Sequence, residues 1–410
     1  MRRFFAKKTV TAALFLFALF VMSFFNLKQA YPFLQADIQQ FVDSSGKSAE
    51  SPATLITNLT STITTDVYQK YAFVETYGFI QKLLDKNEIN NFEVVKDKNG
   101  YLYYTYFTNG PNNIDTIAGR MLRLKQAAAK NGSKVMYLMS PDKYMKGQSI
   151  FETGIPYNYA NETADNFLSA LRKDGVDTLD FRTLMKQDGK YTLSSFYKTD
   201  HHWTVQTSFW AFTKFVDVLQ KKYGLQFPHK AQFTNLSNYN QIVYKDSFIG
   251  SMGEKEGILY TGAEDFTFIY PKFATNFNFY AQTGADLMDM QGRFEKAITY
   301  NSILYGKGDI YDARSDKFFT YMDGNPGFID IRNDNEPKGA RVLFIKDSLM
   351  VPVASFFALG CAQVDMIDPR YFAGSIEDYV KKHKFDYVFV SYSPQNLTEQ
   401  FFPFFKSNAK

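Results

Sequence analysis

Short apolar runs of strand length alternate with helical patterns through much of this chain, and this alternation is the feature that most restricts its fold. Each apolar run is followed or preceded by a segment whose apolar residues recur at helical spacing, as in a β-α-β arrangement. The predicted strands are Lys134–Ser140, Val176–Phe181, Arg341–Ile345, Gln363–Ile367 and Phe385–Val390. The predicted helices are Ile114–Lys130, Asn161–Lys173, Trp203–Tyr223, Met350–Leu359 and Ile376–His383. The sequence therefore predicts an α/β fold, an open and mostly parallel sheet with helices on both faces.

Residues 227–338 do not keep this alternation. They are rich in aromatic residues and turns, with Gly250-Ser251-Met252-Gly253 as one turn cluster and Phe266–Tyr270 as a short strand candidate. We interpret the segment, about 227–338, as an irregular insertion into the α/β domain. A further strand is expected at Tyr101–Phe107, after the turn at Asp97–Gly100.

The N-terminus carries an apolar run, Thr9–Phe25, behind the basic residues Arg2, Arg3, Lys7 and Lys8. Its length suits a membrane-spanning helix, and the basic residues place the N-terminus in the cytoplasm. A cleaved signal peptide is the rival interpretation, but no small-x-small cleavage site follows Phe25. We expect a cytoplasmic tip and membrane anchor at 1–30, a stalk and helix at 31–95, and an extracytoplasmic domain at 96–410.

Composition excludes some classes of partner and of stabilisation. The 410 residues include 46 basic and 42 acidic side chains, interspersed along the chain, for a net charge of +4. This balance gives no case for nucleic-acid binding. The single cysteine, Cys361, has no partner for a disulfide, so an exported domain must be stabilised by its core.

Scarce residue types useful in catalysis gather at Asp200-His201-His202-Trp203. The stretch holds two of the four histidines and one of the two tryptophans in the chain. An imidazole accepts a proton near neutral pH, and a neighbouring carboxylate fixes its tautomer. The predicted position is a loop that leads into a helix, so Asp200 could also serve as the helix N-cap.

Ser348 is the candidate nucleophile. It follows the predicted strand Arg341–Ile345 through the short turn Lys346-Asp347 and precedes a predicted helix. Catalytic groups gather beyond the carboxyl ends of such strands. A second Lys-Asp-Ser, Lys245-Asp246-Ser247, lies in the insertion without a buried strand before it. A serine, a histidine and an aspartate could together perform acyl transfer.

Three short motifs together resemble the bacterial DHHW family, which is related to SGNH hydrolase-like O-acetyltransferases that modify alginate and other exopolysaccharides. The motifs are Asp200–Trp203, Ile345–Ser348 and Ile367–Tyr371, and Ser140–Lys143 also resembles a loop of these proteins. The resemblance covers about 101–402.

The resemblance implies a circularly permuted SGNH hydrolase-like fold, with Ser348, His202 and Asp200 as the catalytic residues. No Gly-x-Asn-Asp block is evident, and Lys346 stands where many SGNH proteins have glycine. The substrate-binding candidates are His201, Trp203, Lys143, Asp347 and Arg370.

Other interpretations of these residues stay open. His202 could be a structural histidine packed on Trp203, and Arg370 and Lys143 could be solvated surface charges. Asp200-His201-His202 could hold zinc or manganese, but a metal site needs further ligands, and His229 and His383 lie in unpromising contexts. We expect no metal and no cofactor.

The resemblance implies a membrane-anchored O-acetyltransferase that acts on a cell-surface or secreted polysaccharide through an acetyl-serine. Acetyl donors such as acetyl-CoA are cytoplasmic, so a membrane-bound O-acyltransferase is the expected donor partner. Two alternatives are a carbohydrate acetyl esterase and a non-catalytic glycan-binding scaffold of a polysaccharide synthesis complex.

Overall fold

The computed structural model describes residues 2–44, 51–65, 67–89, 91–106, 108–305 and 312–406. Residues 45–50 of the expected stalk and Phe107, the last residue of an expected strand, lie outside the described residues. The chain divides into two compact units, Met1–Ile80 and Gln81–Lys410.

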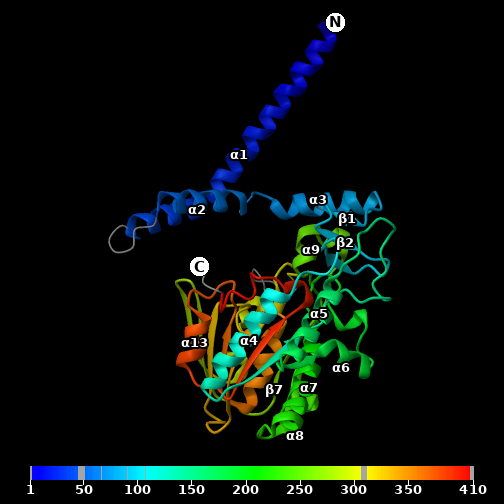
Figure 1. Ribbon diagram of the computed structural model, residues 1–410. Coiled ribbons are helices and arrows are strands. Elements are labelled where there is room, and N and C mark those ends of the chain that lie inside the picture. Colours follow the sequence, from blue (N-terminus) through cyan, green and yellow to red (C-terminus); the bar gives the residue numbers. More distant parts are fainter. Residues whose placement is uncertain are drawn as a thin grey trace. The chain divides into compact units, whose positions relative to one another are not determined.

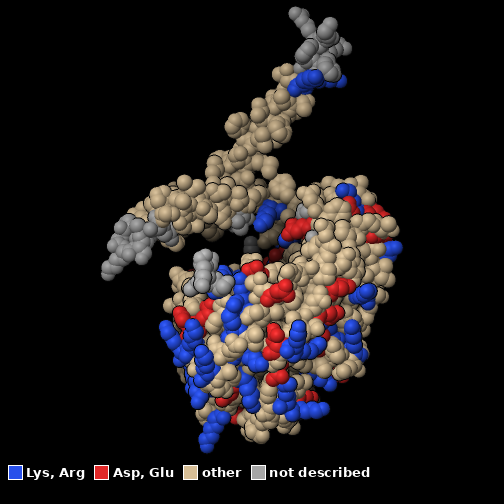
Figure 2. Space-filling model, in the orientation of Figure 1, with Lys and Arg blue, Asp and Glu red and all other residues tan. Residues whose placement is uncertain are grey.

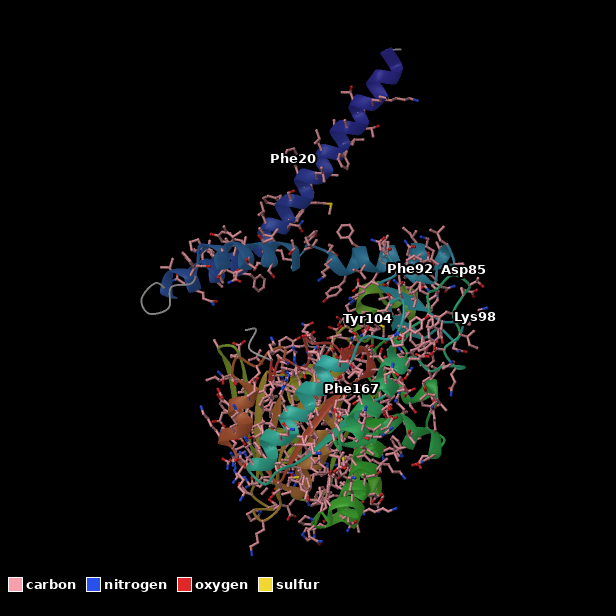
Figure 3. The ribbon with its side chains drawn as sticks, viewed as in Figure 1. Phe20, Asp85, Phe92, Lys98, Tyr104 and Phe167 are labelled. Carbon is pink, nitrogen blue, oxygen red and sulfur yellow. The ribbon has the colours of Figure 1, made fainter. Side chains whose placement is uncertain are left out.

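The first unit is helical. It contains α1 (Arg2–Ser44) and α2 (Pro52–Thr65), and α3 (Lys70–Leu83) begins in it. The expected apolar run lies within α1, which is long and apolar enough to cross a membrane. Apolar side chains such as Phe20 project from α1 into open space (Figure 3), and Figure 2 shows its surface almost without charge beyond the basic residues near its start. A 43-residue helix is about 65 Å long at the usual rise, longer than the hydrocarbon core of a bilayer.

The second unit is built on an eight-stranded sheet in the order β5-β4-β13-β11-β12-β10-β8-β9 (Figure 1). Five neighbouring strands are parallel: β4 (Lys134–Met139), β5 (Asp177–Asp180), β11 (Ala340–Lys346), β12 (Cys361–Ile367) and β13 (Tyr387–Tyr392). Three strands extend the sheet in antiparallel pairing: β8 (Phe277–Thr283), β9 (Asp286–Gly292) and β10 (Phe328–Asn333). The predicted open, mostly parallel sheet is therefore confirmed.

Two hydrophobic cores lie on the two faces of the sheet. In β11, Val342 and Phe344 belong to one core and Leu343 and Ile345 to the other, because successive side chains of a strand point to opposite faces. The first core also contains residues of α6 (Phe181–Gln187), α7 (Val205–Tyr223) and α12 (Met350–Phe357). The second contains residues of α4 (Asp115–Lys130), α5 (Ala160–Lys173) and α13 (Ile376–Lys382). Burial on both faces explains why these strands read as continuous apolar runs.

The segment expected as an irregular insertion is more regular than its sequence suggests. Besides β8, β9 and β10, it forms a long hairpin of β6 (Tyr239–Phe248) and β7 (Glu264–Pro271). Its remaining helices are short: α8 (Lys230–Phe233), α9 (Ser251–Glu256), α10 (Ile258–Thr261) and α11 (Phe294–Ala297). The segment thus both enlarges the sheet and, through α9 and the hairpin, reaches the loop that carries Asp200.

A small sheet of β1 (Glu88–Ile89), β2 (Val94–Lys96) and β3 (Leu102–Tyr104) precedes α4. The N–H of Leu102 donates to the carbonyl of Lys198, which ties this sheet to the Asp200 loop. Single turns of 3₁₀ helix complete the described residues: η1 (Leu193–Ser195), η2 (Leu236–Asn238), η3 (Asn301–Tyr305), η4 (Lys317–Thr320), η5 (Ala358–Gly360) and η6 (Pro394–Asn396).

Candidate active site

The loop that carries Asp200, His201 and His202 is held by buried charges behind it. The Glu264 carboxylate accepts the N–H groups of Lys198 and Thr199 at 2.7 and 2.8 Å. The Lys143 ammonium donates to the carbonyls of Lys198 and Asp200 at 2.9 and 2.8 Å. Backbone groups of a loop have no partners from secondary structure, so these side chains supply them. The loop ends at Thr204, whose hydroxyl caps α7 by accepting the N–H of Thr207.

Ser348 lies in the tight turn between β11 and α12, at the carboxyl end of a central strand. The neighbouring Asp347 is buried and accepts three hydrogen bonds, from the N–H groups of Leu349 and Ser393 and from the Asn396 amide. Asp347 therefore fixes the turn against the end of β13. The position matches the expectation from the sequence.

The structure brings the three predicted catalytic side chains together. The Nε2 atom of His202 lies 2.7 Å from the Ser348 Oγ, and its Nδ1 atom lies 2.5 Å from the Asp200 Oδ1. The Asp200 Oδ1 also accepts the backbone N–H of His202 at 2.8 Å, and its Oδ2 accepts the N–H of Ser251 at 2.7 Å. A histidine bonded in this way is a proton acceptor for the serine and is oriented by the carboxylate.

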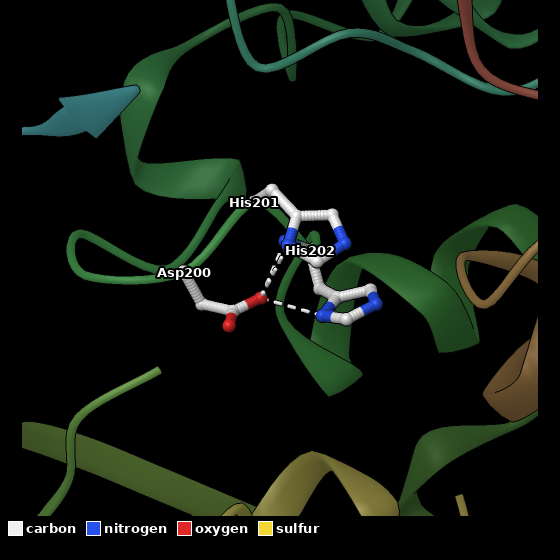
Figure 4. A group of neighbouring side chains, drawn as sticks. All are labelled: Asp200, His201 and His202. Atoms are coloured by element: carbon white, nitrogen blue, oxygen red, sulfur yellow. Dashed lines mark hydrogen bonds and ion pairs between the residues drawn. The ribbon is translucent and has the colours of Figure 1, made fainter. Parts of the chain in front are cut away.

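Asp200, His201 and His202 form one compact group (Figure 4). Burial by itself raises the pKa of the Asp200 carboxyl, but the charges of His202 and His201 and the hydrogen bonds from His202 bring that pKa well below its ordinary value. Burial and the neighbouring His202 lower the pKa of His201 to about 3. At neutral pH, Asp200 is therefore a carboxylate and His201 an uncharged imidazole.

The same group can be considered as a metal site, since one ligand atom of each of its three residues lies within 4.8 Å of the others. The Asp200 Oδ1 and the His202 Nδ1 are bonded to each other, and the other ring nitrogen of His202 is bonded to Ser348. A metal ion would have to replace these hydrogen bonds. The donor set therefore fits a proton-transfer chain better than a metal centre.

The ring of Phe318 packs flat against the imidazole of His202. The ring of Phe318 stacks on His202 with centroids 3.8 Å apart and an angle of 13° between the planes. Phe318 belongs to η4, whose N-cap is Asp316. No pattern in the sequence pointed to Phe318, because it comes from the segment expected as an irregular insertion.

The substrate-binding predictions divide according to exposure. The side chains of His201 and Arg370 are 27% and 26% exposed, so both can meet a substrate. Trp203, Lys143 and Asp347 are buried, so their contact with a substrate stays a prediction. Trp203 donates its indole N–H to the carbonyl of Leu349 at 2.9 Å, which connects the histidine loop to the residue after Ser348.

Buried charges also lie beneath the Ser348 turn. The ammonium of Lys346, the residue found in place of the usual glycine, donates to the Asn325 amide oxygen and lies 3.9 Å from Asp368. Asp368 in turn accepts two hydrogen bonds from the Arg370 guanidinium, at 2.9 and 2.7 Å. Burial lowers the pKa of Lys346 to about 8. This network fixes the direction of Arg370, whose guanidinium also lies over the rings of Tyr371 and Phe401.

A pH-dependent contribution to stability follows from Asp316, whose pKa is raised to about 7 by burial and by the charge of Asp200. A carboxyl with a raised folded-state pKa stabilises the fold fully below its ordinary value of 3.8, and this contribution is lost as the pH rises through about 7. The substitution Asp316→Asn removes the titration. The melting temperature of the parent should fall between pH 5 and pH 8. We expect the fall in the variant to be smaller by about 2–4 °C.

Asp188→Asn is the matched control for that measurement. Hydrogen bonds from Lys214 and Trp210 lower the pKa of Asp188, so it stays ionised throughout the same pH range. Calorimetry measures the melting temperatures. If the melting temperature fell equally between pH 5 and pH 8 in the parent and in Asp316→Asn, Asp316 would already be ionised at pH 5.

Comparison with known proteins adds the family context. Residues 94–241 match the ALGX family model, described as the SGNH hydrolase-like domain of acetyltransferase AlgX. Residues 94–241 of this chain are therefore similar to an SGNH hydrolase-like domain. The match covers about a third of the chain and includes Asp200 and His202 but not Ser348. It confirms the resemblance inferred from the motifs and supports acyl transfer as the general chemistry.

Two solved structures support the fold over most of the second unit. Bacillus cereus PatB1, determined with a sulfonyl adduct, is 18% identical, with a TM-score of 0.62 over 76% of this chain and 98% of that chain. A DHHW family protein from Eubacterium siraeum is 17% identical, with a TM-score of 0.54 over 77% of this chain and 99% of that chain. Among the curated proteins, none matches the chain. At these identities, the likeness concerns the fold alone.

Proposed function

We propose that the protein is an extracytoplasmic, membrane-anchored O-acetyltransferase that acetylates a cell-surface or secreted polysaccharide through an acetyl-serine intermediate. The observation that carries the proposal is the bridge made by His202, with one ring nitrogen 2.7 Å from the Ser348 hydroxyl and the other 2.5 Å from the Asp200 carboxylate. The match of residues 94–241 to an acetyltransferase family supports the same chemistry.

In the first half of the reaction, His202 takes the proton of the Ser348 hydroxyl as the oxygen attacks the acetyl carbon of the donor. The Asp200 carboxylate stabilises the imidazolium that forms. The leaving group of the donor then receives that proton, and the acetyl group remains on Ser348 as an ester. In the second half, His202 takes a proton from a sugar hydroxyl as its oxygen attacks the acetyl-serine, and it then gives that proton to the Ser348 Oγ as the ester bond to Ser348 breaks.

The negative charge on the acetyl oxygen needs hydrogen-bond donors in both halves. Ser348 directly precedes the first turn of α12, and in the described part of the chain its own N–H has no protein acceptor. We assign this N–H to the oxyanion, where the positive end of the helix also favours negative charge. The Leu349 N–H is unavailable for this role because it is bonded to Asp347.

The helix α1 supports the proposed location of the protein at a membrane. Its apolar run after basic residues suits a membrane anchor or a signal, and we propose an uncleaved anchor with the N-terminus in the cytoplasm. An acetyl donor from the cytoplasm then has to reach the outer face of the membrane. A membrane-bound O-acyltransferase that passes the acetyl group across fits this need.

The experiment is a product analysis with the full chain in detergent micelles, 4-nitrophenyl acetate as the donor and oligosaccharides as acceptors. We expect an acetylated Ser348 by mass spectrometry and acetyl-sugar in excess of acetate. A sulfonyl fluoride should block both by modifying Ser348, the kind of reagent that the adduct in PatB1 suggests.

Other outcomes point to the alternatives. Acetate without acetyl-sugar would identify an esterase, since water and a sugar hydroxyl compete for the same acyl-enzyme. Absence of any acyl-enzyme, with oligosaccharides still bound, would contradict the acetyltransferase and favour the scaffold.

A further inference from the structure

A groove of about 480 Å³ lies between the small sheet and the catalytic loop and is lined by four lysines. Lys96 ends β2, Lys98 follows it, Lys82 comes from the last turn of α3, and Lys198 lies two residues before Asp200. Asp85 and Lys98, labelled in Figure 3, lie on the same side of this unit. We call this surface the lysine groove.

Two of the four lysines of the groove differ from lysines that pair closely with a carboxylate, such as Lys222 with Asp177 at 2.7 Å and Lys245 with Asp265 at 2.6 Å. In the described part of the chain, Lys96 and Lys198 form no such ion pair, although both are half-buried. Lys96 instead lies 4.3 Å from the centre of the Tyr260 ring.

The acidic residues of the groove do not neutralise it. Asp97 is buried and accepts the N–H groups of Asn99 and Tyr101 and the Tyr103 hydroxyl. Glu152 lies 3.6 Å from Lys98. Asp85 is then the one other acidic residue that lines the groove beside Lys82, Lys96 and Lys198.

Neighbouring charges also act on Lys96. Burial lowers its pKa; of the neighbouring charges, that of Asp85 has the largest effect and raises the pKa, while those of Lys82 and Lys198 lower it. Like charges held together in this way repel one another, and a bound anion would relieve that repulsion.

The type of residue indicates the type of anion. No arginine lines the groove, and lysine offers compact point charges without the planar fork that matches a carboxylate. Lysine ammonium groups bind phosphate oxygens well as point charges. The groove has a volume of about 480 Å³ and four lysines in its lining, which suits a chain with repeated charges better than a single small ion.

We propose that the lysine groove binds phosphate groups of an anionic acceptor glycan and so retains the polymer beside the catalytic loop. This inference rests on the proposed acetyltransferase function. One repeat of the chain occupies the groove while another reaches Ser348, which raises the local concentration of acceptor hydroxyls. Lys198 connects the two places because its backbone belongs to the loop that carries Asp200.

The test measures binding of three fluorescently labelled polymers to the full chain in detergent micelles: polyphosphate, polygalacturonate and dextran. We expect polyphosphate to bind, with an affinity that falls as salt rises, and dextran not to bind. The double substitution Lys96→Gln and Lys198→Gln should weaken polyphosphate binding by about tenfold or more. The control with equal charge, Lys130→Gln and Lys221→Gln on the exposed ends of α4 and α7, should bind as the parent does.

Three results would overturn the proposal: unchanged polyphosphate binding in the Lys96 and Lys198 variant with an unaltered melting temperature, equal loss in the control, or tighter binding of polygalacturonate or dextran than of polyphosphate. Acylation of Ser348 by 4-nitrophenyl acetate needs no polymer. A parent chain that binds polyphosphate but is never acylated would therefore refute the acetyltransferase and leave the groove as an anion site.

Discussion

The substitution Ser348→Ala is expected to lower the rate of acetyl release from 4-nitrophenyl acetate by a factor on the order of 10⁴ or more, with no acetylated peptide left to detect. In the proposed reaction the hydroxyl oxygen forms the ester, and among the described residues Ser348 supplies the hydroxyl bonded to the His202 Nε2 atom, at 2.7 Å. Alanine removes one oxygen from a half-buried position, so the fold and the melting temperature should stay close to those of the parent. Stopped-flow absorbance and intact-mass spectrometry measure the two quantities.

Ser247→Ala is the matched control because Ser247 ends the second Lys-Asp-Ser of the chain. Its hydroxyl donates to the carbonyl of Tyr244 in a buried part of β6, and in the described part of the chain no hydrogen bond joins it to a histidine. This variant should keep the rate of the parent. Acetyl release that persists in Ser348→Ala and disappears in Ser247→Ala would mean that the nucleophile has been misassigned.

The centre of the sheet could be predicted because its parallel strands are buried on both faces and are therefore apolar along most of their length, unlike the half-buried edge strand β5. The strand before Ser348 is such a case, since all its residues from Val342 to Lys346 are buried. The three antiparallel strands lacked this signal. In β9, every residue is exposed or half-exposed, so its sequence does not differ from that of a loop.

The catalytic residues could be predicted individually but not as an assembly. Asp200 and His202 are neighbours in sequence, and Ser348 follows a buried strand, yet His202 and Ser348 are separated by 146 positions. Only the tertiary fold joins them. One part of this join, the hydrogen bond from Trp203 to Leu349, could not be predicted, because an aromatic residue beside a histidine can equally pack in the core or meet a substrate.

Support from behind the site was invisible in the sequence. Glu264 and Lys143 bind the loop that carries Asp200 from segments far away in the sequence. Ser251 contributes a backbone N–H, which any residue except proline could supply, so its side chain gives no signal in the sequence. The Gly250–Gly253 cluster was recognised as a turn. What the sequence could not show is that this turn lies against Asp200.

Gly250→Ala is therefore the second substitution for which we expect a large effect. A Cβ atom at this position would lie 2.0 Å from the Cβ of Asp200 and 2.3 Å from its Oδ2, distances that no structure tolerates. The backbone angle φ of Gly250 is −76°, which alanine adopts freely, so the conflict is one of space alone. Because Asp200 is fully buried, either its carboxylate or the Gly250–Ser251 backbone must move, and the hydrogen bond from the Ser251 N–H is lost.

The expected result is a fall in the rate of acetyl release by about 10²–10⁴, since a carboxylate displaced by even about 1 Å no longer orients the histidine. Gly119→Ala in α4, where an added Cβ meets nothing within 4 Å, controls for the extra methyl group and should react as the parent does. A Gly250→Ala enzyme with the rate of the parent would show that the site does not depend on the position of Asp200, and the proposed role of this carboxylate would have to be abandoned.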